Sequence, residues 1–340
     1  MFVPKRIIFE KGTLDYEIGK RIYDTFHEKE GIEIIETVAN KVKSIITTDS
    51  ISETYQSGKQ TLVVSKKKSS AFQTCKPSAD YMLPLVSGCM GQCEYCYLHT
   101  QLGDKPFVRV NVNMEDIYAK AISYMEASPD KVTSFEGSAT SDPLCIEPYT
   151  HVLEETIRFF AHEPRGSFRF VTKFSDVDSL LNLDHNGKTE IRFSINTELV
   201  RSSYEHHTAT ISARIHAAAK VMKAGYPVGF LIAPVFLYDN WQTEYEAVLK
   251  ELKEALPEVY PYPLFFEVIT HRFTPRAKEL IGNLFPESTL PMDEEIRVYK
   301  RGQFGYGKFT YAKEDMREVK AFFKEKIKEY FPESEVKYVV

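Results

Sequence analysis

The segment Ser87–Tyr97 has the sequence SGCMGQCEYCY and places three cysteines close together, Cys89, Cys93 and Cys96. Thiolates at this C-x3-C-x2-C spacing can bind one face of a four-iron cluster, because soft sulfur ligands suit iron–sulfur chemistry. Three ligands for four irons leave one iron open to an amino-carboxylate, as cluster-driven cleavage of S-adenosylmethionine requires. The alternative is a zinc site, which would need a fourth ligand such as His99.

Outward from this segment, short strands rich in β-branched and aromatic residues alternate with amphipathic helical stretches. The clearest helix is Ala209–Ala224, because Ile211 and Ile215 recur on one face and Gly225 with Pro227 ends it. Strands that alternate with helices indicate a parallel sheet, and six such units predict a partial (β/α)6 TIM-like barrel with an N-terminal accessory α/β segment. Periodicity alone leaves an open doubly wound sheet as the alternative. In both architectures, chemistry is expected at the C-terminal ends of the strands. The expected strands are Tyr81–Val86, Lys131–Phe135, Phe168–Thr172, Glu190–Ile195, Val228–Ala233 and Leu264–Ile269.

The chain is expected to divide near residue 76. Residues 1–76 are interpreted as the accessory segment, with a strand at Thr61–Val64 followed by the basic run Lys66-Lys67-Lys68. We expect that run to be a solvated loop rather than a DNA contact. Residues 77–340 are assigned to the barrel, which includes a C-terminal hairpin at about 299–308.

The composition restricts the classes of protein open to the chain. Of its 340 residues, 43% are hydrophobic and 13% aromatic, which is enough for a substantial core. Five cysteines, three of them close together, fit metal ligation in a reducing compartment better than a disulfide framework. The sequence offers neither a membrane span nor a signal peptide, so we expect a cytoplasmic protein with no membrane partner. The formal net charge of −5 disfavours binding by general phosphate attraction, so any nucleic-acid contact must come from local basic patches.

Many stretches outside the cysteine segment match one known family. They are Phe2-Val3-Pro4, Lys76-Pro77-Ser78-Ala79, Leu102-Gly103-Asp104-Lys105-Pro106, Thr140-Ser141-Asp142, Arg169-Phe170-Val171-Thr172-Lys173, His185-Asn186-Gly187-Lys188-Thr189, Arg192-Phe193-Ser194-Ile195-Asn196, His271-Arg272-Phe273-Thr274 and Gly305-Tyr306-Gly307-Lys308. Through these stretches the chain resembles, nearly end to end, the spore photoproduct lyase family of the radical S-adenosylmethionine superfamily.

The resemblance implies a DNA repair lyase that converts the lesion 5-thyminyl-5,6-dihydrothymine into two thymines. A 4Fe-4S cluster held by Cys89, Cys93 and Cys96 would reduce S-adenosylmethionine, and the resulting 5′-deoxyadenosyl radical would take a hydrogen atom from the lesion. The cofactor is re-formed at the end of each turnover. The implied partners are double-stranded DNA carrying the lesion and an electron donor such as flavodoxin or ferredoxin, and the implied location is the cytoplasm of the spore core and germinating cell.

Two other classes of protein stay open on the residues alone. One is a radical S-adenosylmethionine enzyme that acts on another nucleic-acid or small-molecule substrate. The other is a non-catalytic metal-dependent DNA-binding module.

The resemblance also implies roles for polar residues near strand ends. Ser141 and Lys173 would meet the cofactor or the lesion, and a lysine suits a carboxylate or phosphate. Ser194, Asn196 and the backbone at Ala233 would cradle the ribose and adenine. Each polar side chain can equally serve as a cap or loop residue.

Tyr95 and Tyr97 flank the third cysteine of the motif. In the family, two such tyrosines help to return the radical to the cofactor, so the resemblance implies a hydrogen-atom relay. The alternative is that both rings pack against the cluster and keep it dry.

The largest departure from the family is Ala139, since familiar members carry at this position the cysteine that quenches the thymine radical. Because the other three thiols are assigned to iron, Cys75 and Cys145 are the candidates for a replacement donor. Familiar members have serine at Cys75. We expect Cys75 to be the donor, because the stretch around it matches the family and is expected to border the substrate cleft. The alternative for either thiol is a small buried hydrophobe.

The stretch 299–308 combines Lys300, Arg301 and Lys308 with aromatic residues and glycines and contains no acid. A hairpin of this composition can insert an aromatic wedge into a duplex while its cations meet phosphates. The family usually has Arg-Tyr where this chain has Gln303-Phe304. We expect Lys300, Arg301, Gln303 and Phe304 to contact DNA.

Overall fold

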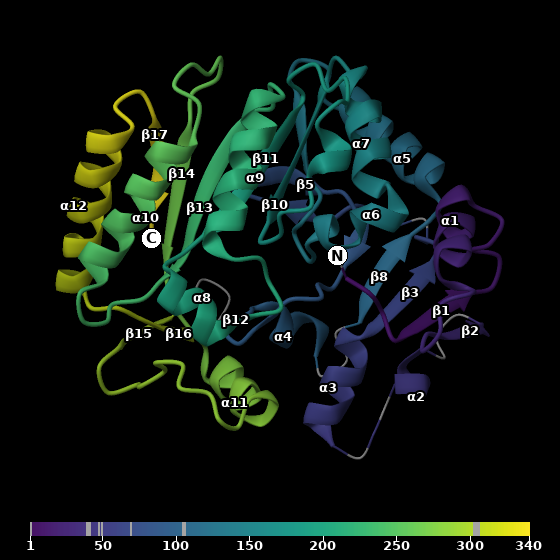
Figure 1. Cartoon of the computed structure of the whole chain (residues 1–340), viewed down its shortest axis with the longest axis horizontal. Helices are drawn as coiled ribbons and strands as arrows, with labels where there is room; N and C mark the ends of the chain where they lie inside the picture. The colour runs from purple at the N-terminus through teal and green to yellow at the C-terminus, as the bar shows by residue number, and fades with distance from the viewer. Residues whose placement is uncertain are drawn as a thin grey trace. The chain divides into compact units, whose positions relative to one another are not determined.

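The computed structural model describes residues 2–38, 42–46, 48, 50–68, 70–103, 107–301 and 307–340. The chain forms two compact units (Figure 1). The first unit comprises Met1–Met90, Leu102–Thr172 and Asp176–Ile191, and the second comprises Gly91–Gln101, Lys173–Ser175 and Arg192–Val340. The division at residue 76 stays a prediction.

One sheet lies wholly in the first unit and has the strand order β2-β1-β3-β8-β6. Strands β1, β2, β3 and β8 run parallel, whereas β6 is antiparallel to β8. The strand predicted at Thr61–Val64 is confirmed as β3, whose residues are all buried. The sheet therefore joins strands from before residue 76 to two strands that follow it. The elements are β1 (Arg6–Glu10), α1 (Glu17–Phe26), β2 (Glu33–Thr37), α2 (Val42–Ile46), α3 (Ile51–Lys59), β3 (Thr61–Ser65), β6 (Val86–Ser87) and β8 (Val108–Asn111).

The larger sheet has the order β4-β5-β9-β10-β11 in the first unit and β11-β13-β14-β17 in the second. Its pairs β5/β9, β9/β10, β13/β14 and β14/β17 are parallel, and β4 is antiparallel to β5. Five of the six expected barrel strands are confirmed to within two residues of their predicted ends. The strands are β4 (Thr74–Cys75), β5 (Ala79–Met82), β9 (Thr133–Glu136), β10 (Gly166–Thr172), β11 (Thr189–Ile195), β13 (Val228–Val235), β14 (Phe265–Thr270) and β17 (Glu335–Val339).

The remaining expected strand, Tyr81–Val86, is wrong in its extent. Strand β5 ends at Met82, and the Leu83 N–H still donates to the Glu136 carbonyl over 2.9 Å. Pro84 has no N–H to continue the ladder, so the run is broken there. The chain then enters β6, which belongs to the other sheet.

Helices of the second unit lie alongside β13, β14 and β17 (Figure 1). The helix predicted at Ala209–Ala224 is confirmed as α9 (Ile211–Lys223), and the Thr210 hydroxyl caps it by accepting from the Ala213 N–H. Trp241 of α10 packs edge-on against Phe322 of α12, with ring centroids 4.9 Å apart. The other helices of this unit are α4 (Leu98–Leu102), α8 (Glu198–Tyr204), α10 (Trp241–Ala255), α11 (Pro275–Leu284) and α12 (Lys313–Tyr330).

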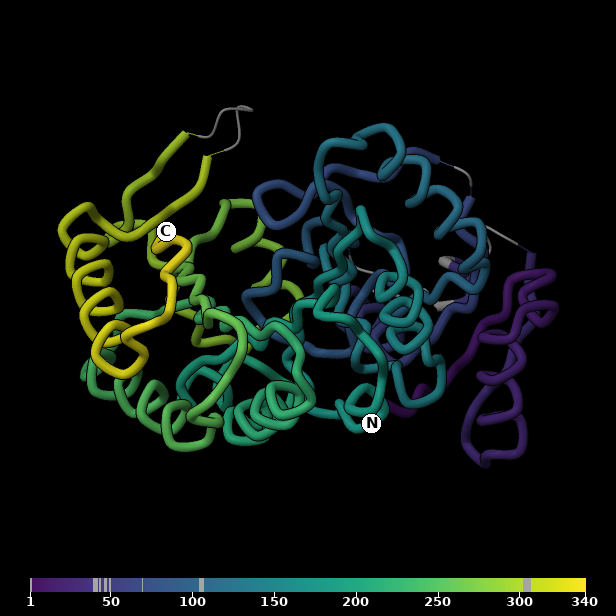
Figure 2. Tube along the Cα trace, turned by 90° about the horizontal axis from the view of Figure 1, so that it is seen from above, coloured from purple at the N-terminus to yellow at the C-terminus, as the bar shows by residue number. Residues whose placement is uncertain are grey.

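The remaining elements complete the two units. In the first unit they are α5 (Met114–Glu126), α6 (Glu147–Thr150), α7 (Val152–Ala161) and two 3-10 turns, Pro143–Ile146 and Asp178–Leu180. In the second unit, β7 (Gln92–Cys93) pairs with β12 (Glu205–His206), and β15 (Val298–Arg301) pairs with β16 (Gly307–Thr310). Figure 2 shows β15 and β16 running side by side close to the C-terminal end of the chain. Among the described residues, no helix has the length and apolarity needed to cross a membrane.

Candidate active site

Cys89 lies in the first unit, in the loop that follows β6. The residue before it, Gly88, has a φ of +77°, and an added Cβ would lie 2.3 Å from the Phe107 carbonyl oxygen. Only glycine fits there without strain. The Gly88 N–H donates to the Thr140 carbonyl over 2.8 Å, and Gly88 forms a parallel bridge with Ser141. The first cysteine of the motif and the loop of Ser141 are thereby held together.

Two further side chains contact Cys89. Lys59 is only 3% exposed, and its Nζ donates to the Cys89 carbonyl over 2.7 Å. A hydrogen bond with the Cys145 thiol, together with burial, raises the pKa of the Cys89 thiol, while the charge of Lys59 acts in the opposite direction. Cys145 is 1% exposed, and its Sγ donates to the Asp142 carbonyl over 2.9 Å. Cys145 is therefore packed beside the thiol of a proposed cluster ligand.

Cys93 and Cys96 lie in the second unit, where backbone bonds fix their loop. Cys93 pairs in register with Glu205 in the short β7/β12 ladder. The Cys96 N–H donates to the Cys93 carbonyl over 3.1 Å, and the His99 Nε2 lies 3.0 Å from the same oxygen. This nitrogen of His99, which was considered as a zinc ligand, is thus engaged with the backbone of the loop.

The donor set of the motif fits an iron–sulfur cluster. Cys89, Cys93 and Cys96 supply the three thiol groups of the motif. Three soft donors suit a four-iron cluster with one open iron, whereas a closed structural zinc site takes four protein ligands. Within the described part of the chain, no three His, Cys, Asp or Glu side chains are already grouped to hold a metal ion. The assignment of a cluster therefore rests on the chemistry and spacing of the thiols.

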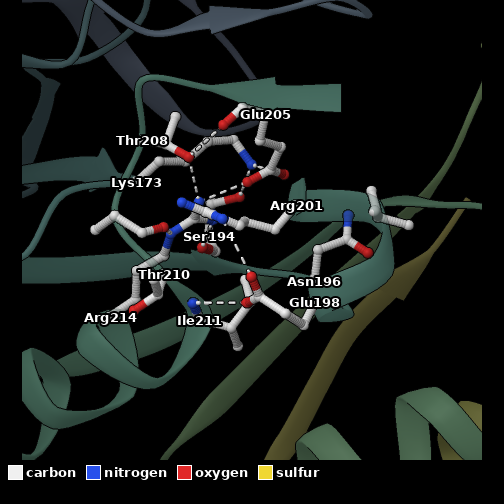
Figure 3. Close-up of polar contacts among 12 residues, drawn as sticks. Lys173, Ser194, Asn196, Glu198, Arg201, Glu205, Thr208, Thr210, Ile211 and Arg214 are labelled. Carbon is white, nitrogen blue, oxygen red and sulfur yellow. Dashed lines mark hydrogen bonds and ion pairs between the residues drawn. The ribbon is translucent and has the colours of Figure 1, made fainter. Parts of the chain in front are cut away.

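A cluster of polar residues in the second unit contains Lys173 and Ser194, two of the residues predicted to bind the cofactor (Figure 3). The Lys173 Nζ donates to the Ser194 Oγ over 2.8 Å and to the Ala233 carbonyl over 3.4 Å. The same nitrogen lies 2.8 Å from the Glu205 Oε1. Lys173, Ser194 and Ala233 come from the loop after β10, from β11 and from β13, so the sheet gathers them as predicted for the C-terminal ends of strands.

Glu205 is the residue of this group that sequence reasoning missed. Its side chain is fully buried, and its Oε2 lies 2.6 Å from a terminal nitrogen of Arg214, which is itself fully buried. The Tyr95 hydroxyl donates to the Glu205 Oε1. Burial alone would raise the pKa of Glu205, but the charges of Lys173 and Arg214 and the hydrogen bonds from Lys173 and Tyr95 hold it at about 2. The carboxylate is therefore an anion at any physiological pH.

Two other predicted residues have separate surroundings. Asn196 is fully buried, with its Nδ2 donating to the Pro234 carbonyl and its Oδ1 accepting from the Tyr245 hydroxyl, each over 2.8 Å. The amide thus braces the chain after Ala233. Tyr97 is 55% exposed, whereas the ring of Tyr95 packs against the core residue Phe236.

The segment of Cys75 and the segment of Ala139 share one carboxylate. The Ser78 hydroxyl, three residues after Cys75, donates to the Glu136 Oε2 over 2.7 Å. The Ser138 hydroxyl, one residue before Ala139, donates to the Glu136 Oε1 over 2.6 Å. Cys75 is partly exposed, in contrast to Cys145. Glu136 therefore links the turn that follows Cys75 to the loop that contains Ala139.

The predicted DNA contacts are only partly within the described residues. Lys300 and Arg301 lie on β15, all of whose residues are exposed. Lys300 pairs with Lys308 across the ladder. Burial and the nearby charges of Arg272 and Lys300 lower the pKa of Lys308, which indicates a concentration of positive charge. Gln303 and Phe304 lie outside the described residues.

Comparisons with known proteins agree on one family. The family model for spore photoproduct lyase matches residues 2–340. The spore photoproduct lyase of Clostridium acetobutylicum is 46% identical over 336 residues, covering 99% of this chain and 98% of the relative. That of Bacillus subtilis is 41% identical over 338 residues, with the same coverage.

Solved structures give the same result. A spore photoproduct lyase complexed with dinucleoside spore photoproduct matches with a TM-score of 0.95 and 40% identity, covering 100% of this chain and 99% of that one. A second match, with a TM-score of 0.94, 41% identity and the same coverage, is a variant in which a cysteine is replaced by alanine and a serine by cysteine. It contains bound S-adenosylmethionine and dinucleoside spore photoproduct.

Through these matches the chain is assigned to the mixed α/β proteins with a partial TIM-like barrel, as predicted, and to the radical S-adenosylmethionine lyases. Within that class it belongs to the spore photoproduct lyase family. The predicted family, fold class and cofactors, a 4Fe-4S cluster and S-adenosylmethionine, are confirmed.

Proposed function

We propose that this chain reverses the spore photoproduct 5-thyminyl-5,6-dihydrothymine in DNA to two thymines. The observation that carries the proposal is the full-length match to an enzyme of this family solved with the dinucleoside lesion bound. The cluster and S-adenosylmethionine, when bound, supply the radical that starts the reaction.

The residues of this chain would then bind the cluster and the cofactor and orient them. Cys89, Cys93 and Cys96 hold the cluster. Lys173 offers an ammonium for the carboxylate of the cofactor or for a phosphate, and of its hydrogen bonds to Ser194, Glu205 and Ala233 the one to Ala233 is the longest. A bound anion would replace that contact at least cost. Ser141, Ser194, Asn196 and Ala233 are the other residues proposed for this pocket.

Cys75 is proposed as the final hydrogen-atom donor. The S–H bond of Cys75 would break as a C–H bond forms on the thymine radical. A hydrogen atom from 5′-deoxyadenosine, relayed through Tyr95 and Tyr97, would then re-form the S–H bond, and the deoxyadenosyl radical so regenerated would allow the cofactor to be re-formed. Two observations favour Cys75 over Cys145: Cys75 is partly exposed, and Glu136 links the turn that follows Cys75 to the loop of Ala139. A matched structure of the family carries the same kind of exchange, a cysteine lost to alanine and a serine changed to cysteine.

Double-stranded DNA carrying the lesion is the proposed substrate, and Lys300, Arg301, Gln303 and Phe304 are its proposed contacts. The electron would come from a flavodoxin or ferredoxin. The proposed location is the cytoplasm of the spore core and germinating cell.

The test of the function is anaerobic incubation of the iron-loaded protein with reductant, S-adenosylmethionine and an oligonucleotide that carries the lesion. We expect release of intact thymines, and none from Cys93→Ala, because losing one thiolate removes a cluster ligand. Cofactor cleavage without thymine release would instead indicate a radical enzyme with another substrate. One zinc per chain after anaerobic purification would indicate the binding module.

The test of the donor compares Cys75→Ala with Cys145→Ala in the same assay. Cys75→Ala should retain its cluster and the first hydrogen abstraction, but divert the thymine radical into side products. Cys145→Ala should release thymines as the parent does. If the two variants behave the other way round, Cys145 is the donor.

A further inference from the structure

The predicted relay residue Tyr95 and the predicted cofactor contact Lys173 meet on one oxygen of Glu205. We infer that Glu205 is a positioning residue for the reaction. Its buried carboxylate holds the Tyr95 hydroxyl and the Lys173 ammonium in a fixed position relative to each other. This inference rests on the proposed function for the roles of Tyr95 and Lys173.

The geometry divides the two carboxylate oxygens between two tasks (Figure 3). Oε1 receives the Lys173 ammonium at 2.8 Å and the Tyr95 hydroxyl. Oε2 receives Arg214 at 2.6 Å. Because Arg214 also donates to the Ser194 carbonyl and the Thr208 hydroxyl, over 3.0 and 2.8 Å, it fixes the carboxylate to the end of β11. The Glu205 carboxylate is therefore held in one orientation, with Oε1 facing Lys173 and Tyr95.

The backbone of Glu205 adds a second connection. Glu205 pairs with Cys93 in the β7/β12 ladder, and the Glu94 N–H donates to the Tyr204 carbonyl over 2.9 Å. Glu205 thus contacts the proposed cluster ligand Cys93 through its backbone. Through its side chain it contacts Tyr95, which lies two residues after Cys93. A displacement of Glu205 would move the cluster loop and Lys173 relative to each other.

A purely stabilising role accounts poorly for this arrangement. A buried ion pair is a weak source of stability, since desolvation of both charges offsets their attraction. Here a second cation and a phenol are added to the same carboxylate, and Lys173 keeps 19% of its side chain exposed while Arg214 keeps none. The group therefore presents one cation to the surroundings and buries the other, as expected of a support for a binding residue.

The test uses Glu205→Gln, which keeps the size of the side chain and removes its charge, in the iron-loaded protein under anaerobic conditions. Affinity for S-adenosylmethionine, measured by equilibrium binding, should fall about 10- to 100-fold, the range for loss of a charge-assisted hydrogen bond. Iron and sulfide content should stay at the parental level. In the repair assay, more 5′-deoxyadenosine should accumulate per thymine released, because a displaced Tyr95 returns hydrogen less efficiently.

The matched control is Glu198→Gln in the same unit, since Glu198 forms an exposed pair with Arg201 and should leave all three readouts unchanged. Glu205→Asp keeps the charge but shortens the reach, so it should show the same changes in affinity and product ratio even if Glu205→Gln does not fold. Tyr95→Phe alone should raise the amount of 5′-deoxyadenosine per thymine released. Combined with either Glu205 substitution, it should cause no further increase.

Parental affinity and a parental product ratio in a folded Glu205 variant with full iron content would overturn the inference. Failure of the parent itself to release thymines would count against the proposed function. The binding measurement would still decide whether Glu205 supports Lys173.

Discussion

Two glutamates of this chain, Glu147 and Glu205, are both completely buried, yet their pKa values are shifted in opposite directions. Burial raises the pKa of Glu147 to about 8, and hydrogen bonds from the N–H groups of Leu153 and Glu154 do not reverse it. The carboxyl of Glu205 has a pKa of about 2 because Lys173 and Arg214 lie against it. The partners, and not the depth of burial, decide which charge state the fold contains.

The difference indicates what each carboxyl group is for. Glu147 accepts from two N–H groups at the start of α7, over 2.7 and 2.9 Å, a capping role that needs oxygens but no charge. Glu205 is held as an anion among residues proposed to bind the cofactor. A fixed buried anion can orient a cation and a hydroxyl donor that would otherwise be mobile.

The largest effect is expected from breaking the ion pair on Glu205. Arg214→Met removes one of its two cations and the contacts to Ser194 and Thr208, so the free energy of unfolding should fall by about 3–5 kcal/mol. Arg201→Met, which breaks only the exposed pair with Glu198, should cost about 1 kcal/mol or less. Urea unfolding of both variants checks this. Equally small losses of unfolding free energy in the two variants would mean that Arg214 contributes little to fixing the Glu205 carboxylate.

Much of this comparison could not be predicted from the sequence. Five of the six expected barrel strands, β3 and α9 follow from local patterns, β-branched and aromatic runs and a helical apolar face, and their positions agree with the prediction. The break at Pro84 also has a local cause and was missed because the apolar run continues through it. Glu205 had no such signal, because Tyr95 lies 110 residues away in the sequence and Lys173 lies 32 away. The carboxylate of Glu205, in the sequence YEHH, contacts Tyr95, Lys173 and Arg214 only when the chain is folded.

A second prediction concerns acid. The pKa of Glu205 is about 2 in the folded chain against an ordinary 4.5, so its stabilising effect is full above pH 4.5 and is lost as the pH falls toward 2. One pKa unit corresponds to about 1.4 kcal/mol, so this group should contribute a loss of about 3 kcal/mol across the window. Glu205→Gln should therefore show a shallower fall of unfolding free energy between pH 5 and 3 than the parent. Parallel curves would contradict the low pKa.

Glu147 should give the opposite slope in a different pH range. Its pKa of about 8 lies above the ordinary 4.5, so the folded state holds a proton that the unfolded state has released, and stability should fall as pH rises from 4.5 to 8. Between pH 5.5 and 7.5, the stability of Glu147→Gln relative to the parent should rise by about 2–3 kcal/mol. Urea unfolding at the two pH values measures this. A relative stability of Glu147→Gln that is higher at pH 5.5 than at pH 7.5 would contradict the raised pKa of Glu147.

The smallest effect is expected where cations are neither buried nor held by a buried carboxylate. Lys300 and Arg301 are exposed on β15 and lie near Lys308, so they can follow a phosphate backbone without first breaking a buried ion pair. A cation that meets one phosphate releases about 0.9 counterion, so Lys300→Ala should reduce the slope of log K against log salt for duplex DNA by about 0.9. The slope can be measured by fluorescence anisotropy at several salt concentrations. Lys66→Ala, in the run expected to be a solvated loop, is the matched control and should leave the slope unchanged. If Lys66→Ala lowers the slope and Lys300→Ala does not, the basic run near the N-terminus contacts DNA and the hairpin strand does not.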